Sequence, residues 1–175
     1  LLLLFFVEGV PFHNAVSKDL ARKNCFDEKY VDEEIKSIIS LIREKKPNSI
    51  IPLPFFHVGT DYYNISGTEK IIKASLTACY HSKTPLMASL TPRNSLTEAE
   101  SLIQLVSNDL IEREIKTKVP TSGSFILLYS KDDLSEEETA LLAKGKVLLE
   151  TPNFIVKELT HAELFASSRS QKQED

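Results

Sequence analysis

Apolar and polar residues follow one another in blocks that predict amphipathic helices. Between Asp32 and Lys46, isoleucines recur at i, i+3, i+4 and i+7 while charged residues take the other positions, the spacing of a helix with one buried face. Blocks 66–82, 95–110 and 135–145 each open with Ser followed three residues later by Glu, the sequence of a capping box. We expect a helix in each block, and Thr160 with Glu163 can cap one last helical turn. The predicted buried faces include Ile35, Ile38, Ile39 and Ile42, then Ile71, Ile72, Leu76 and Cys79, then Leu102, Ile103, Val106 and Leu110.

Continuous apolar runs separate these blocks. Residues 1–7, 50–58, 85–90 and 125–129 form such runs, and shorter ones follow at 147–149 and 154–156. A run without alternation is typical of a strand buried on both faces, as in a parallel sheet. The repeated order of strand, loop and capped helix predicts a parallel sheet covered by helices.

Two prolines indicate where one of these strands lies. Pro52 and Pro54 interrupt the run 50–58. Residues two apart direct their backbone N–H groups to the same side, so both prolines remove donors from one edge, and we expect that edge to have no partner strand. The order 2-1-3-4-5 places the second strand outermost. The predicted fold class is α/β: three layers, a mostly parallel sheet of about five strands and helices on both faces, flavodoxin-like or Rossmann-like.

The composition argues against some classes of function but does not identify one. The 175 residues are 42% hydrophobic, and 25 acidic against 21 basic residues give a net charge of −4. We expect one α/β domain over residues 1–166, a disordered polar tail over 167–175, and no binding to a nucleic-acid backbone. Only two cysteines are present, which favours the reducing cytoplasm. The apolar run 1–7 is too short to span a bilayer, so we expect no membrane contact.

Motifs that hold cofactors do not occur in the sequence. Neither a P-loop nor Gly-x-Gly-x-x-Gly follows any predicted strand, so we expect no nucleotide cofactor. The histidines show no pairing at metal-ligand spacing, so we expect no metal.

Candidate site residues follow from position alone, because parallel α/β sheets bind ligands at the carboxyl ends of their strands. We expect the crevice between the first and third strands, where an acid, an imidazole and a guanidinium suffice for acid–base chemistry on a small anion. Glu8 or His57 would be the catalytic base. The predicted ligand-binding residues are His13, Thr60, Asp61, Arg93 and Ser95.

Two hypotheses about function stay open. The first is a non-catalytic or regulatory α/β binding module that acts through protein partners, because glycines are few and no catalytic motif occurs. The alternative is a hydrolase or transferase that acts on a small anionic metabolite, phosphorylated or of nucleoside type, at the strand ends.

Overall fold

The computed structural model describes residues 14, 16–18, 24, 26–60, 62–91, 94–108, 111 and 113–166. The chain divides into two units, Leu1–Val31 and Asp32–Asp175, and each is described by itself. In the first unit a short 3-10 helix, η1 (Glu28–Tyr30), follows Asp27, whose side chain accepts a hydrogen bond from the Lys29 amide. The predicted strand 1–7 and tail 167–175 lie outside the described residues, and the extent of the predicted domain stays a prediction.

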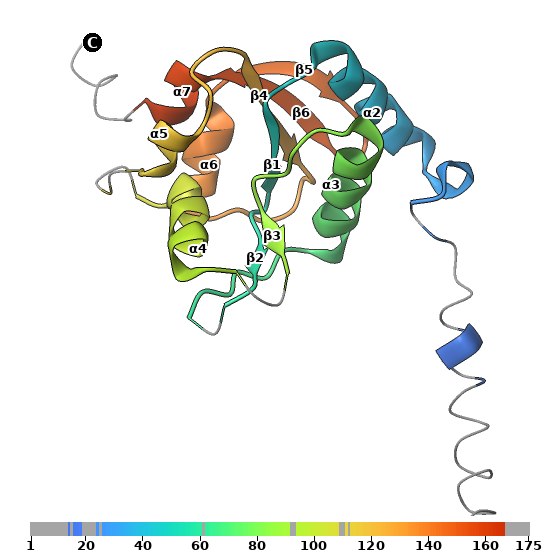
Figure 1. Cartoon of the computed structure of the whole chain (residues 1–175). Coiled ribbons are helices and arrows are strands. Elements are labelled where there is room, and N and C mark those ends of the chain that lie inside the picture. The colour runs from blue at the N-terminus through green and yellow to red at the C-terminus, as the bar shows by residue number, and fades with distance from the viewer. Residues whose placement is uncertain are drawn as a thin grey trace, which may run out of the picture. The chain divides into compact units, whose positions relative to one another are not determined.

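Helices and strands are interspersed along the second unit, as labelled in Figure 1. Its helices are α2 (Glu33–Lys45), α3 (Glu69–Ser82), α4 (Leu96–Ile103), the 3-10 helix η2 (Gln104–Val106), α5 (Ile115–Lys118), α6 (Glu136–Ala143) and α7 (His161–Phe165). Its strands are β1 (Ser49–Leu53), β2 (His57–Val58), β3 (Ser89–Leu90), β4 (Ser124–Tyr129), β5 (Lys146–Glu150) and β6 (Ile155–Thr160). One sheet has the order β1-β4-β6-β5, and β2 pairs with β3 in a second, two-stranded sheet.

The larger sheet is mixed, so the predicted three-layer fold with a mostly parallel sheet of about five strands is wrong. β1 runs parallel to β4, whereas β6 runs antiparallel to both β4 and β5. The flavodoxin-like order is wrong as well, because β4 lies directly beside β1. The physical reason lies partly in the connection between β5 and β6. Residues 151–154 are too few for the crossover that parallel neighbours need, so the two strands form a hairpin.

β1 is the terminal strand of the larger sheet, in agreement with the prediction from Pro52 and Pro54. The prediction that this edge has no partner is wrong at Ile50, which forms an isolated parallel bridge with Leu86. The Ile50 amide donates to the Pro85 carbonyl at 2.8 Å. Because Pro52 and Pro54 have no N–H to offer on that side, pairing resumes only beyond them, where β2 meets β3.

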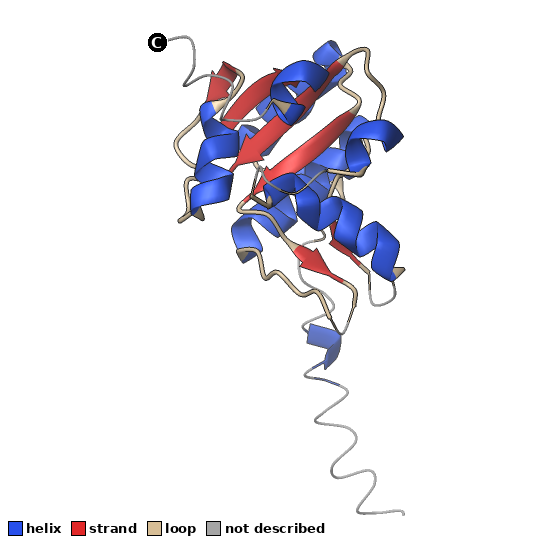
Figure 2. Ribbon diagram, turned by 90° about the vertical axis from the view of Figure 1, so that its left-hand side faces the viewer, coloured by secondary structure: helices blue, strands red, loops and turns tan. Residues whose placement is uncertain are grey.

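Alternate strand residues face two different sets of helices. On one face, residues of β1, β4 and β6 form a core with η2, α5, α6 and α7. On the other face, α3 contacts β1 and β4 and packs against α2. Figures 1 and 2 show helices on both sides of the strands. The first core contains Ile51, Leu53, Phe125, Leu127 and Leu159 from the strands; the second face buries Ile50, Ile126, Leu128 and Val156.

The predicted buried face is correct for α2 and wrong for α4. All four isoleucines of α2 are buried. In α4, by contrast, Leu102 is only partly buried and Leu105 is fully buried. The α-helix ends at Ile103 and a 3-10 turn follows, which changes the angle between successive side chains. An α-helical period therefore selects the wrong leucine.

Helix caps agree with the sequence at most of the predicted positions. Ser135 and Thr160 each form a complete capping box with the Glu three residues later. The predicted box at Ser66 is wrong, because α3 begins after Thr68, whose side chain accepts a hydrogen bond from the Ile71 amide. Ser95 caps α4 through a hydrogen bond from the Glu98 amide, but the return bond of the predicted box is not among the contacts of the described residues.

Candidate functional site

The structure describes three of the predicted site residues. Glu8, His13, Asp61 and Arg93 lie outside the described residues, so the predicted crevice around them stays a prediction. His57, Thr60 and Ser95 are described, and each lies in or beside β2 or at the start of α4.

His57 is enclosed by the protein. Its side chain is fully buried, and neither ring nitrogen has a hydrogen-bond partner in the part of the chain that the structure describes. Burial lowers the pKa of the imidazole below its usual 6.5, because desolvation disfavours the charged form. Its backbone pairs with Ile65, N–H to O at 2.9 and 2.8 Å. In the structure the imidazole is closed to solvent, and a role for His57 as the base of the crevice stays a prediction.

Thr60 and Ser95 use their hydroxyl groups to hold nearby backbone. The Thr60 Oγ1 accepts a hydrogen bond from the Tyr63 amide at 2.8 Å and donates to the Tyr63 carbonyl at 3.1 Å. The Ser95 Oγ accepts a bond from the Glu98 amide at 3.2 Å. Both hydroxyls therefore have structural roles. Among the described residues, no hydrogen bond joins either hydroxyl to the His57 side chain.

A polar network joins the end of β3 to the start of α4. The Ser89 Oγ lies 3.0 Å from the Thr91 Oγ1, which donates to the Asn94 side-chain oxygen, and the Asn94 amide nitrogen donates back to Ser89. Gly59 lets this loop approach β2, since a Cβ there would lie 2.4 Å from the Thr91 carbonyl oxygen. The backbone amide of Asn94 completes the link by donating to the Gly59 carbonyl at 3.0 Å.

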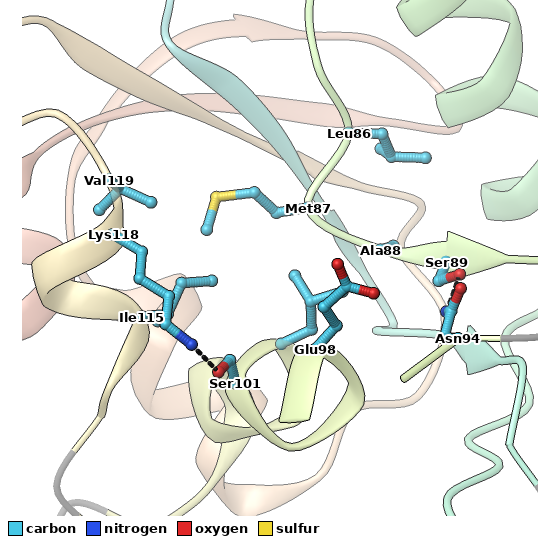
Figure 3. A pocket seen from close by; sticks show the side chains of 11 residues that line it. Leu86, Met87, Ala88, Ser89, Asn94, Glu98, Ser101, Ile115, Lys118 and Val119 are labelled. Carbon is cyan, nitrogen blue, oxygen red and sulfur yellow. Dashed lines mark hydrogen bonds between the residues drawn. The ribbon is translucent and has the colours of Figure 1, made fainter. Parts of the chain in front are cut away.

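Beside this network lies a groove between the segment that contains β3 and the helices α4 and α5. Its volume is about 400 Å³, and Figure 3 shows the side chains that surround it. The walls are mainly apolar, with Met87 and Ile115 each only 6% exposed. The polar lining groups belong to Ser89, Asn94, Glu98, Ser101 and Lys118; the apolar ones belong to Leu86, Met87, Ala88, Leu102, Ile115 and Val119.

The two charged groups of the groove differ in their partners. Lys118 donates a hydrogen bond from its Nζ to the Ser101 Oγ at 2.8 Å and lies 3.8 Å from the Glu114 carboxylate. The Glu98 carboxylate makes no hydrogen bond or ion pair with any described residue. In Figure 3 it points into the space below Met87 and Ala88. The groove therefore presents one free carboxylate against apolar walls.

Sequence reasoning missed this groove, because the position of Glu98 three residues after Ser95 is that of a capping residue. We expected Glu98 to return a hydrogen bond to Ser95 in a capping box, as Glu138 does to Ser135. Among the described contacts of Glu98, only its backbone amide takes part in capping. The side chain is turned to the groove instead. Lys118 and Ile115 belong to the short helix α5, which has no periodic pattern of its own.

A second polar cluster lies where β4 ends and α3 begins. The Asp132 carboxylate accepts hydrogen bonds from the Ser130 Oγ at 2.6 Å, the Thr68 Oγ1 at 2.9 Å and the Lys70 Nζ at 2.8 Å. Burial raises its pKa, but these bonds outweigh burial and hold the pKa below its usual range. Because these contacts tie the end of β4 to the start of α3, we assign the cluster a structural role.

The described residues contain no candidate metal site and no candidate membrane span. Across the described ranges, no group of three or more His, Cys, Asp or Glu side chains could hold a metal ion. No helix in the same residues has both the length and the apolar character needed to cross a bilayer. No protein-family model, no curated protein and no solved structure matches this chain.

Proposed function

We propose that this chain is a non-catalytic binding module that acts through a protein partner, and that the groove between β3, α4 and α5 takes a segment of that partner. The observation that carries the proposal is the groove itself. About 400 Å³ falls within the roughly 300–1,000 Å³ of ligand-binding pockets. Its floor of Met87 and Ile115 is apolar and fixed by burial, as in the pockets that receive an anchoring side chain.

Exposed leucines next to the groove support a protein partner. Leu90 follows Ser89 at the end of β3 and is 43% exposed; Leu96 follows the Ser95 cap at the start of α4 and is 47% exposed. Apolar side chains beside an apolar groove, with charged groups at the rim, resemble the make-up of protein interfaces. A partner that extends beyond the groove along β3 or α4 would meet these leucines.

The alternative, an enzyme for a small anionic metabolite, is not favoured by the residues that the structure describes. His57 is enclosed, while the hydroxyls of Thr60 and Ser95 are occupied by local backbone. His57 is therefore not available to a ligand without a rearrangement, and the two hydroxyls are already engaged in part by local backbone. The binding module is therefore the function that we carry forward.

Peptide selection followed by mapping tests the proposal. A random peptide library is selected against the folded chain, and the bound peptides are mapped by amide chemical shifts. We expect the shifts to concentrate at residues 86–89, 98–102 and 115–119. Ala88→Phe, which fills the groove, should weaken binding at least about tenfold, equivalent to about 1.4 kcal/mol.

Val147→Phe is the matched control, because Val147 is 48% exposed on β5 and does not line the groove. It should leave peptide binding unchanged. The proposal is wrong if selected peptides map away from the groove, or if folded Ala88→Phe binds them as tightly as the unchanged chain.

A further inference from the structure

We infer that the groove recognises a basic side chain, lysine or arginine, of the partner. Its aliphatic stem would lie against Met87 and Leu102, and its charged head would reach the Glu98 carboxylate. This inference rests on the proposed function and adds the chemistry of the group that is bound.

The first argument is the state of Glu98. Of the two charged groups that line the groove, Lys118 already has partners in Ser101 and Glu114. The Glu98 carboxylate has none among the described residues and points into the groove in Figure 3. A free carboxylate beside a hollow binds a donor or a cation more readily than another anion.

The second argument is the charge around the groove. Lys118 is the cation among the lining residues, and its ammonium is already shared between Ser101 and Glu114. The negative charge of Glu98 is therefore not compensated by Lys118 and favours a cationic group.

The third argument is the shape of the ligand that these walls fit. Lysine and arginine combine an apolar stem with a charged end, and proteins bury the stem while the head stays at a polar site. The groove has both features that such a side chain needs: apolar side chains of the β3 segment and α5 for the stem, and one carboxylate of α4 for the charged head. A purely apolar anchor would leave the Glu98 carboxylate desolvated without a partner, which is unfavourable.

A titration with small probes tests the inference. Pentylguanidinium and 1-pentanol share the pentyl stem, pentanoate carries the butyl stem, and the three probes differ mainly in the head. Each probe is added to the folded chain while amide shifts are followed. We expect pentylguanidinium to bind at groove residues about three- to fivefold more tightly than 1-pentanol, as expected for a partly exposed ion pair. Pentanoate should bind most weakly.

Variants of α4 identify the carboxylate responsible. Glu98→Gln should reduce the preference for pentylguanidinium over 1-pentanol to about one, and Glu98→Lys should reverse it in favour of pentanoate. Glu100→Gln is the matched control, because Glu100 does not line the groove, and it should keep the preference. Amide spectra of each variant show whether the fold is retained.

The outcomes separate this inference from the proposed function. If 1-pentanol and pentylguanidinium bind the groove equally, or if Glu98→Gln keeps the preference, the basic-side-chain inference is wrong while the groove remains a binding site. If neither the probes nor selected peptides shift groove residues, both the inference and the proposed function are wrong.

Discussion

At the scale of single residues, His57 is a titratable group in an environment far from that of water. Its ring is fully buried and its two nitrogens lack hydrogen-bond partners in the described part of the chain. A buried polar group without a partner costs about 1–3 kcal/mol, and a charged one costs more. The folded protein therefore favours the neutral imidazole, in line with the lowered pKa of His57.

This environment predicts a pH dependence. Because the pKa of His57 in the folded protein lies below its usual 6.5, the unfolded chain binds a proton at pH values where the folded chain does not. The part of the stability that depends on a neutral His57 is thus fully present above pH 6.5, and it falls as the pH drops below that value. His57→Leu should reduce this loss. Urea unfolding of both proteins at pH 7.5 and pH 5.5 measures it; an unchanged difference between the two pH values would contradict the prediction.

At the scale of elements, the junction of α4 and η2 decides which leucine enters the core. Ala99 and Leu105 are fully buried, whereas Leu102 is only partly buried and lines the groove. The change from α-helix to 3-10 helix after Ile103 turns Leu105 toward the core. One short segment thus supplies both a core residue and a wall of the binding groove.

The two leucines should differ in their contribution to stability. Leu105→Ala removes fully buried methyl groups and should lower the free energy of unfolding by about 2–5 kcal/mol. Leu102→Ala should cost less, since its side chain already borders the open groove. Urea unfolding of the two variants checks the order, and a larger loss for Leu102→Ala would show that the groove is closed in solution.

At the scale of the whole second unit, polar contacts tie the sheet to its helices. Asp132 connects the end of β4 with Thr68 and Lys70 at the start of α3. The buried Glu138 of α6 accepts a hydrogen bond from the Phe55 amide. These links join segments that are far apart in the sequence.

Removing the first of these links has a measurable cost. Asp132→Ala leaves the Ser130 and Thr68 hydroxyls and the Lys70 ammonium without their common acceptor, and should destabilise the protein by about 1–3 kcal/mol. Asp133→Ala is the neighbouring control at an exposed position and should change stability by less than about 0.5 kcal/mol. Thermal unfolding at pH 7 distinguishes them; equal losses would mean that the Asp132 contacts contribute nothing specific.

The lowered pKa of Asp132 adds a second readout. Its contribution is present at neutral pH and is lost as the pH falls through the acidic range, because protonation removes the acceptor for Lys70. The difference between Asp132→Ala and the unchanged protein should therefore shrink toward pH 3.

The sequence by itself determined the features that depend on near neighbours. The spacing of four isoleucines located α2, and Ser135 and Thr160 located the starts of α6 and α7. These signals are local, because a helix forms its backbone hydrogen bonds within its own segment and its capping contact spans only three residues. The β5–β6 hairpin also has a local cause, since only residues 151–154 separate its strands.

Only the tertiary structure decided how the strands pair and where the groove lies. A continuous apolar run has the same appearance whether the strand pairs in parallel or antiparallel, because the strand is buried in both cases. The direction of pairing depends on partner strands that are distant in the sequence. The groove depends in the same way on segments that meet in space. From the sequence, Glu98 has the position of a capping residue. Only the fold places Met87 and Ile115 at the same groove, because these residues come from other segments than the helix of Glu98.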